Sequence, residues 1–376
     1  MSNERYDGIN IIKIIATLFV IGLHLIGQGG LLNSLYLQKR NVLPITTVYA
    51  LMYTCINLFA LSTGFLMFKK KRIRSKRITN IFLITIFYSL LISLICYSFN
   101  MFNVRNMAGS SNDMSNFLIY GNVNYNSSKY LFFGSIFQIF FGNYWFISSY
   151  ILLLFLIPYL NGFIENIDQK KFKQLLIIMF LFISVYTTIA LGIDIFRISG
   201  GYSPFWLVYI YLIGAYIGKY HADFKLNKKS VCVLISVILL CLFASSLGNV
   251  ILNKYELKNN VSFYYICRFI DHISPFNLIT SICVFLLLFK IRIKSKFKKT
   301  ILNFFSGESL FVYIIHANNI VYFHLLFNLL LKQSTLPFFN MISVLFLYVV
   351  GIYFICVAFD LIFRIIPSKL YQKIRS

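Results

Sequence analysis

Long apolar segments recur along this chain, and they constrain its fold more than any other feature. Ten of them can be drawn, over approximately residues 9–27, 44–68, 79–99, 143–160, 174–193, 204–219, 230–251, 275–290, 309–331 and 338–366. A run of about 20 apolar residues is long enough to cross a bilayer as one helix. Hydrophobic residues make up 59% of the 376 residues, more than the core of a soluble domain requires. We therefore expect an all-α polytopic membrane protein with about ten transmembrane helices, formed by one integral-membrane domain over residues 1–376.

The net charge of +24 raises the question of a nucleic-acid partner, but the positions of the basic residues favour another explanation. If the N-terminus is cytoplasmic, 25 of the 35 Lys and Arg residues fall in cytoplasmic segments and 9 fall in external ones. Cytoplasmic loops of membrane proteins carry such an excess. We expect both termini in the cytoplasm, a multi-pass protein of the plasma membrane with the lipid bilayer as a partner, and no nucleic acid.

The cysteines and the first residues set two further expectations. The seven cysteines match no metal-binding spacing and fall mostly in apolar segments, so we expect small buried side chains, with no disulfide required and no metal. The start of the chain lacks a basic region, and Gly-Gln-Gly-Gly after the first segment does not resemble a cleavage site. We expect the first segment to stay in place as a signal anchor.

The first apolar segment carries two ionisable residues, Lys13 and His24. Ionisable groups in a membrane span are costly and usually mark a functional site. The two positions are about three helical turns apart, which places both side chains on one face, roughly 16 Å apart along the axis. An imidazole gains and loses a proton near neutral pH, so His24 suits a general base for a hydroxyl group.

Each of these two residues also has a structural interpretation. His24 would then be a hydrogen-bonded histidine of the core, and Lys13 would extend its ammonium group to the cytoplasmic headgroups. The functional alternative for Lys13 is a cation that holds an anionic donor or stabilises a developing negative charge. Their shared face favours the functional interpretation of His24, while both interpretations of Lys13 stay open.

A basic cluster over residues 69–77 follows the second apolar segment. Its members include Arg72, Arg74, Lys76 and Arg77. The cluster is an ordinary orientation signal, and it is also suited to binding phosphate groups. A second basic segment, over residues 290–299, either assists in this or contacts anionic lipid.

The later apolar segments contain fewer residues that point to a function. Trp145 lies at the start of the fourth segment, where an aromatic belt explains it adequately. Tyr313 and His316 share a helix face in the ninth segment, and Asp360 is the only clear mid-span carboxylate. The polar loop over residues 100–129 is either a solvated connection or a surface that faces sugar, and we expect residues 261–274 at the membrane interface.

Several stretches together resemble membrane-bound acyltransferase family 3, whose members are polysaccharide O-acetyltransferase-like membrane proteins. The first segment is similar to the family's opening signature, a basic residue and a histidine separated by ten positions; Lys13 stands where many members have arginine, which keeps the charge but loses the planar fork. The other stretches that resemble the family are residues 57–65 of the second segment, with their Ser-x-Gly-aromatic pattern, Arg72 and Arg77, residues 143–146 with Pro158, and residues 313–316.

The resemblance implies transfer of an acetyl or other short acyl group from cytoplasmic acetyl-CoA to a hydroxyl of an extracytoplasmic or lipid-linked polysaccharide. We expect no permanently bound cofactor. His24 would be the general base or a transient acyl carrier, with Lys13 and His316 as further catalytic residues. Arg72, Arg74, Lys76 and Arg77 would hold the donor. Contacts with the substrate are expected from Ser62, Trp145 and Tyr313, of which Ser62 and Tyr313 are possible oxyanion donors together with His316.

A transporter or flippase for a glycan or a lipid-linked sugar, without acyl transfer, is the competing class. Many spans, a basic inner face and a polar outer loop also suit that function. A proton-coupled transporter usually has carboxylates within its spans, and here Asp360 is the only clear one. The scarcity of such carboxylates disfavours coupled transport and leaves passive translocation as the alternative to the enzyme.

Overall fold

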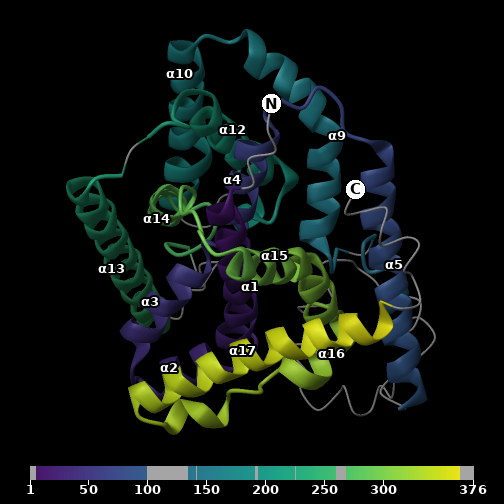
Figure 1. Ribbon diagram of the computed structural model, residues 1–376. Helices are drawn as coiled ribbons and strands as arrows, with labels where there is room; N and C mark the ends of the chain where they lie inside the picture. Colours follow the sequence, from purple (N-terminus) through teal and green to yellow (C-terminus); the bar gives the residue numbers. More distant parts are fainter. Residues whose placement is uncertain are drawn as a thin grey trace.

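The computed structural model describes residues 6–99, 134–140, 142–190, 194–224, 226–259 and 268–364. Regular structure in these residues is helical throughout, without a strand (Figure 1). The polar loop over residues 100–129 lies outside the described residues, as do residues 261–267 of the segment expected at the membrane interface. The all-helical prediction is confirmed for the part of the chain that can be described.

The helices follow the apolar segments in chain order. The first half contains α1 (Asp7–Gly27), α2 (Leu31–Gln38), α3 (Val42–Met52), α4 (Cys55–Met67), α5 (Ser75–Ser98) and α9 (Trp145–Asn166). The second half contains α10 (Gln169–Met179), which continues as a π-helix (Phe180–Tyr186) into α11 (Thr187–Ile189), then α12 (Pro204–Tyr220), α13 (Lys228–Asn259), α14 (Pro275–Leu288), α15 (Lys296–His316), α16 (Asn319–Val321) and α17 (Phe338–Phe363).

Seven helical stretches among the described residues are long and apolar enough to cross a membrane. An eighth would be counted if α15 and the bent segment after it form one span. Two of the ten predicted segments, 204–219 and 275–290, are helical but short, since α12 has 17 residues and α14 has 14. The protein is therefore a multi-pass helical membrane protein, and the count of ten stays a prediction.

Helices α1, α4 and α12 form the centre of the molecule. Almost every residue of α4 is buried, and α4 packs along α12 at very short range. A Cβ atom on Gly64 would lie 2.1 Å from the carbonyl oxygen of Tyr211, and one on Gly214 would lie 2.3 Å from that of Leu61. Small residues let helix backbones approach in membranes, so these two glycines set the distance between the two helices.

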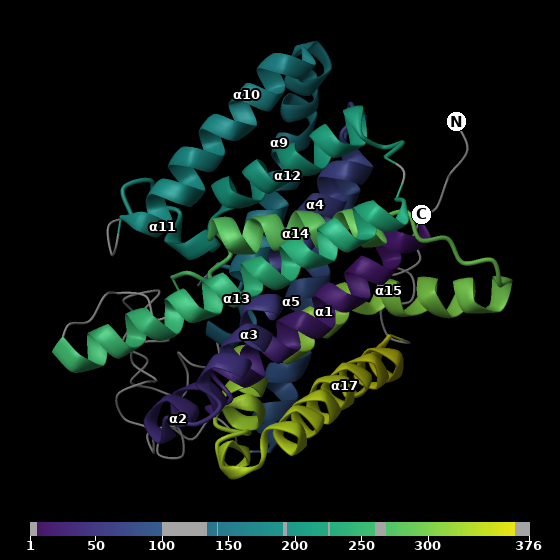
Figure 2. The ribbon, with the colours of Figure 1, turned by 90° about the vertical axis from the view of Figure 1, so that its left-hand side faces the viewer.

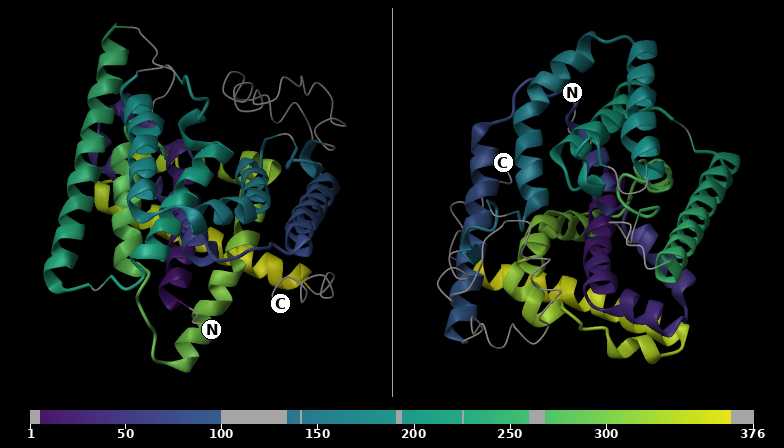
Figure 3. Two further views of the ribbon diagram at one scale, coloured as in Figure 1. Left: turned by 90° about the horizontal axis from the view of Figure 1, so that it is seen from above. Right: turned by 180° about the vertical axis from the view of Figure 1, so that it is seen from behind.

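The outer helices present apolar side chains at the surface. Figures 1 and 3 place α13 and α5 at opposite edges of the molecule, and Figure 2 shows α13 facing the viewer. Large apolar residues on α13 are exposed, among them Leu239, Leu240 and Phe243, each with more than half of its surface open. This distribution is expected where lipid replaces water as the solvent.

The ninth predicted segment is bent and does not form one straight span. Helix α15 ends at His316, and the helical segment after it, Asn319–Leu326, turns away by 68°. The side chain of Asn318 accepts a hydrogen bond from the backbone N–H of Ile320 at 3.0 Å and so caps the new helical turn. The hydroxyl of Tyr144 donates to the carbonyl oxygen of Ile314 at 2.7 Å, next to the bend. Together these bonds fix His316 at the corner.

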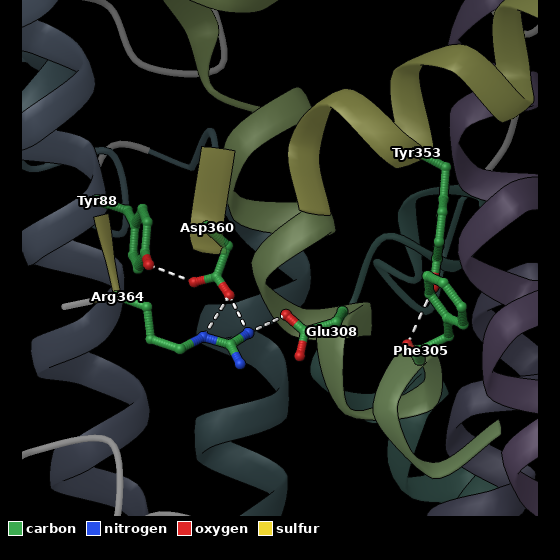
Figure 4. Close-up of polar contacts among 6 residues, drawn as sticks. All are labelled: Tyr88, Phe305, Glu308, Tyr353, Asp360 and Arg364. Atoms are coloured by element: carbon green, nitrogen blue, oxygen red, sulfur yellow. Dashed lines mark hydrogen bonds and ion pairs between the residues drawn. The ribbon is translucent and has the colours of Figure 1, made fainter. Parts of the chain in front are cut away.

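A buried ionic cluster joins three helices near the end of α17 (Figure 4). Arg364, just after α17, pairs with Asp360 of the same helix and with Glu308 of α15. The hydroxyl of Tyr88 on α5 donates to Asp360. Glu308 and Asp360 are both fully buried, and a buried carboxylate needs such a partner. The cluster therefore holds α5, α15 and α17 together, and Tyr353 adds a hydrogen bond to the carbonyl oxygen of Phe305 at 2.9 Å.

Candidate active site

One large cavity of about 1430 Å³ runs through the helical bundle along α1. The sequence-predicted site residues come from five separate stretches of chain, and the structure brings all ten of them to its wall: Lys13, His24, Ser62, Arg72, Arg74, Lys76, Arg77, Trp145, Tyr313 and His316. Their positions make one continuous site feasible, while the role of each residue stays a prediction.

The cavity has a basic end and an aromatic end. The amide of Asn161 near the end of α9 donates to the carbonyl oxygens of Met67 and Lys70, which places this part of α9 beside the basic cluster. Trp145 begins the same helix, so it lies roughly 24 Å away at about 1.5 Å per residue. The basic cluster and Trp145 thus mark opposite ends of one chamber.

No carboxylate of the described residues neutralises the cations of the basic end that line the cavity. Arg72, Arg74, Lys76 and Arg77 are exposed at the cavity wall, and none of them forms an ion pair with the described residues. Lys71, which is not at the wall, pairs instead with Glu165 at 3.4 Å. The second basic segment, 290–299, does not line the cavity: Lys299 pairs with Asp7 at 3.3 Å. The basic end is therefore suited to binding an anion that the described residues do not supply.

Lys13 carries the positive charge of this end deeper into the bundle. Its side chain is half-buried, lines the cavity, and makes no ion pair with the described part of the chain. The positive charge of Arg77 acts on it. Two cations that face one cavity repel each other, and an anion placed between them would relieve that repulsion.

His24 and His316 face each other further along α1. Their ring centroids are 5.3 Å apart, and the ring of Tyr322 meets His24 edge-on at 5.6 Å. The Nδ1 atom of His24 is buried and has no hydrogen-bond partner among the described residues. Two imidazoles in contact at a cavity wall can accept, hold and pass on a proton.

The ring of His316 is held in one tautomer by its own helix. Its Nδ1 lies 2.6 Å from the carbonyl oxygen of Val312. Because a carbonyl only accepts, Nδ1 carries the proton, and the Nε2 atom of the neutral ring has a lone pair. This Nε2 atom is buried without a partner in the described residues. His316 therefore offers an acceptor at the bend after α15.

The three residues expected to contact the substrate differ in the hydrogen bonds and ring contacts that they make. The Ser62 hydroxyl already donates to the carbonyl oxygen of Leu58 at 2.7 Å, so it presents lone pairs to the cavity and would stabilise an oxyanion only after rotation. Tyr313 packs against Phe146 and His316, with ring centroids 5.6 and 6.0 Å away. Trp145 packs against Tyr202 at 4.8 Å.

Sequence reasoning missed Asp271, His272 and Tyr202, which line the aromatic end. The segment that holds Asp271 and His272 was expected at the membrane interface, but the structure buries both side chains, with exposures of 6% and 0%. The sequence feature that could have pointed to them is the pair of adjacent ionisable residues, Asp271 and His272, in an otherwise apolar stretch. Their approach to Trp145 follows from tertiary contacts, which no local pattern encodes.

Other ionisable residues of the later apolar segments lie elsewhere. Glu308 and Asp360 belong to the ionic cluster of Figure 4 and are absent from the cavity wall, as is His324. Among the described residues, no three His, Cys, Asp or Glu side chains are grouped so that they could hold a metal ion.

The fold and the cavity define the class of protein: a multi-pass helical membrane protein with an internal polar site. A family model described as an acyltransferase domain matches residues 6–361, nearly the whole chain. The chain belongs to acyltransferase family 3, and it is a membrane acyltransferase by that membership. No curated protein and no solved structure matches the chain.

Proposed function

We propose that this protein transfers an acetyl or other short acyl group from cytoplasmic acyl-CoA to a hydroxyl group of an extracytoplasmic or lipid-linked polysaccharide. Acetyl-CoA would be a substrate and not a resident cofactor. The observation that carries the proposal is the charge pattern of the cavity. At one end it has cations that form no ion pair with the described residues, and further along the same wall it has two imidazoles in contact.

The donor fits this pattern chemically. Coenzyme A has a phosphorylated head and a long, thin arm that ends in the thioester. Arg72, Arg74, Lys76 and Arg77 would bind the phosphates at the basic end, because guanidinium and ammonium groups pair well with phosphate. Lys13 would be the last cation along the arm, and the thioester would then reach His24.

Two routes of transfer are compatible with this arrangement. In the first, His24 takes the proton of the acceptor hydroxyl, the oxygen forms a bond to the thioester carbon, and the carbon–sulfur bond breaks. In the second, the His24 nitrogen is acylated first and the acceptor oxygen then displaces it. In the first route, the protonated His24 then gives that proton to the leaving thiolate. In the second, the acylated ring of His24 loses its N–H proton to the lone pair of His316, which passes it to the leaving thiolate, and the proton of the acceptor hydroxyl later returns to His24 through His316.

The proposal also implies how the protein is oriented and in which membrane it lies. The basic end would face the cytoplasm, where the donor is found, and the excess of Lys and Arg in the same segments supports that direction. Both termini would be cytoplasmic, with about ten spans of one domain in the plasma membrane. The aromatic end would then open toward the outer leaflet, where a polysaccharide acceptor arrives.

The transporter alternative receives no support from a specific contact. Its best candidate for proton coupling was Asp360, and that carboxylate is paired with Arg364 away from the cavity. A carboxylate that is held in an ion pair away from the cavity has no place on a transport route through that cavity.

Replacement of His24 tests the enzyme directly. We expect His24→Ala to abolish O-acylation of the cell-surface polysaccharide, measured by NMR of the purified polymer, while the protein level in the membrane stays normal. His24→Gln tests whether shape alone suffices, and we expect it to be inactive as well. His221→Ala is the matched control, because His221 is exposed at the end of α12. Full O-acylation in the His24→Ala strain would reject the proposed function.

A further inference from the structure

The aromatic end of the cavity has polar groups that the chemistry at His24 does not use. Asp271 and His272 lie there, in the segment between α13 and α14. We propose that they form, with Trp145 and Tyr202, a binding site for one pyranose ring of the acceptor. This inference rests on the proposed function and deepens it by assigning the residues that recognise the sugar.

The segment that carries Asp271 and His272 is fixed to the bundle. Asn57 on α4 donates to the carbonyl oxygen of His272 at 3.0 Å, and the indole N–H of Trp206 donates to Asn57 at 2.9 Å. Asn57 lies ten residues before Met67 on α4, so this anchor is about 15 Å from the basic end at roughly 1.5 Å per residue. The proposed sugar site is thus spatially separate from the donor site.

Asp271 is placed at the wall by its neighbours. Arg268 donates to the carbonyl oxygens of Thr188 at 2.7 Å and Thr187 at 2.6 Å. Burial raises the pKa of the Asp271 carboxyl group, although the charge of Arg268 acts in the opposite direction. Gly200 lies opposite with a φ of +65°, and a Cβ atom there would come within 3.2 Å of the Asp271 carboxylate. The absence of a side chain at Gly200 therefore keeps space beside the carboxyl group.

His272 offers an acceptor next to that carboxyl group. Its Nδ1 lies 2.6 Å from the carbonyl oxygen of Tyr53, so Nδ1 carries the proton. Burial lowers the pKa of His272 to about 4, so the ring is neutral at physiological pH. Its Nε2 atom is buried and has no hydrogen-bond partner in the described part of the chain. A buried acceptor without a partner is costly unless a ligand satisfies it.

Aromatic rings surround these two polar groups. The rings of Trp145, Tyr202 and His272 form a chain of contacts, with centroids 4.8 and 5.2 Å apart, and Tyr53 meets His272 at 4.8 Å. A sugar has apolar C–H faces and hydroxyl groups at its edge. Aromatic surfaces with a few placed polar groups therefore match a pyranose better than they match a lipid chain or a phosphate.

Tryptophan fluorescence gives a direct binding test, because the chain has only two tryptophans. Trp206 is fully buried and bonded to Asn57, so its emission should stay constant. We would titrate the full-length protein in lipid nanodiscs with the methyl pyranosides of glucose, galactose, mannose and N-acetylglucosamine. We expect at least one of them to change the emission saturably, and the Trp145→Phe variant to lose that change.

Two conservative variants identify the polar contacts. Asp271→Asn keeps the shape of the side chain, and His272→Asn keeps a donor toward Tyr53 while it removes the Nε2 acceptor. We expect each to weaken pyranoside binding at least tenfold, with an unchanged melting temperature and with coenzyme A affinity within twofold of the wild type. Tyr255→Phe, on the exposed part of α13, is the matched control.

Three outcomes would overturn the inference. They are no response to any of the four pyranosides, an emission change with adenosine but not with sugars, and an equal loss of coenzyme A and pyranoside binding in the Asp271→Asn variant. The test is independent of catalysis, because His24→Ala should bind the pyranoside normally. Failure of the proposed function would appear instead as no release of thiol from acetyl-CoA by a protein that still binds sugar.

Discussion

The rings of His24 and His316 lie in contact, with centroids 5.3 Å apart, although one comes from the first helix and the other from the end of α15. Neither ring nitrogen that faces inward, Nδ1 of His24 or Nε2 of His316, has a partner in the described residues. The pair therefore has unused capacity for hydrogen bonds and protons at the middle of the cavity wall. This relationship underlies the first prediction.

Removal of the second imidazole should reduce turnover while the donor still binds. A positioned acid or base contributes about 10²- to 10⁴-fold to a rate, so we expect His316→Ala to lower the rate of acyl transfer within that range. The measurement is thiol release from acetyl-CoA by purified protein with its acceptor, alongside the donor affinity. An unchanged rate would assign His316 to packing at the bend of α15.

Neutralisation of the basic end should weaken donor binding. We expect Arg77→Gln to raise the dissociation constant of acetyl-CoA roughly tenfold, which corresponds to about 1.4 kcal/mol. Lys71→Gln removes the same charge from the same basic cluster but away from the cavity, so it should leave the affinity within twofold. Equal effects of the two variants would show that the cluster acts only through net charge or orientation.

The contribution of Lys13 to the rate of acyl transfer should depend on its charge more than on its shape. We expect Lys13→Met, which keeps the length of the side chain, to lower the rate of acyl transfer at least tenfold. Lys13→Arg keeps the cation and should retain most activity, because guanidinium also binds anionic groups. If Lys13→Met is fully active, the ammonium group serves the membrane interface alone.

The close contact between α4 and α12 predicts a stability effect without a charge change. Gly64→Ala would place a Cβ atom 2.1 Å from the carbonyl oxygen of Tyr211, and overpacking of this kind costs about 1–3 kcal/mol. Gly162→Ala is the matched control, because α9 has open space there and alanine favours a helix by roughly 0.5–1 kcal/mol. Melting temperatures in detergent should fall for the first variant and hold or rise for the second.

The ionic cluster should be needed for stability and not for chemistry. Arg364→Met leaves Glu308 and Asp360 buried without their cation, and breaking such a group costs roughly 3–5 kcal/mol. Glu165→Gln disrupts the exposed pair with Lys71 and should cost at most about 1 kcal/mol. Thermal unfolding measures both. Little change in the Arg364→Met variant would mean that the two carboxylates share a proton and need no cation.

The sequence alone predicted the class of protein and the first helix of the site. Long apolar runs leave a chain few alternatives to membrane helices, because no backbone group can stay unsatisfied in hydrocarbon. The spacing of Lys13 and His24 similarly places both on one face, because the helical period is fixed. The resemblance at His24 and Arg77 pointed to the family that the match over residues 6–361 shows.

The tertiary structure decided the rest of the site. Contact of His316 with His24 depends on the packing of α15 against α1, and the position of the segment with Asp271 and His272 depends on bonds to Asn57 and Thr188, which are distant in the chain. Local patterns encode period and length, whereas such contacts arise when separate helices pack. The sequence by itself determined that polar groups lie within membrane helices; only packing decided which of them share one cavity.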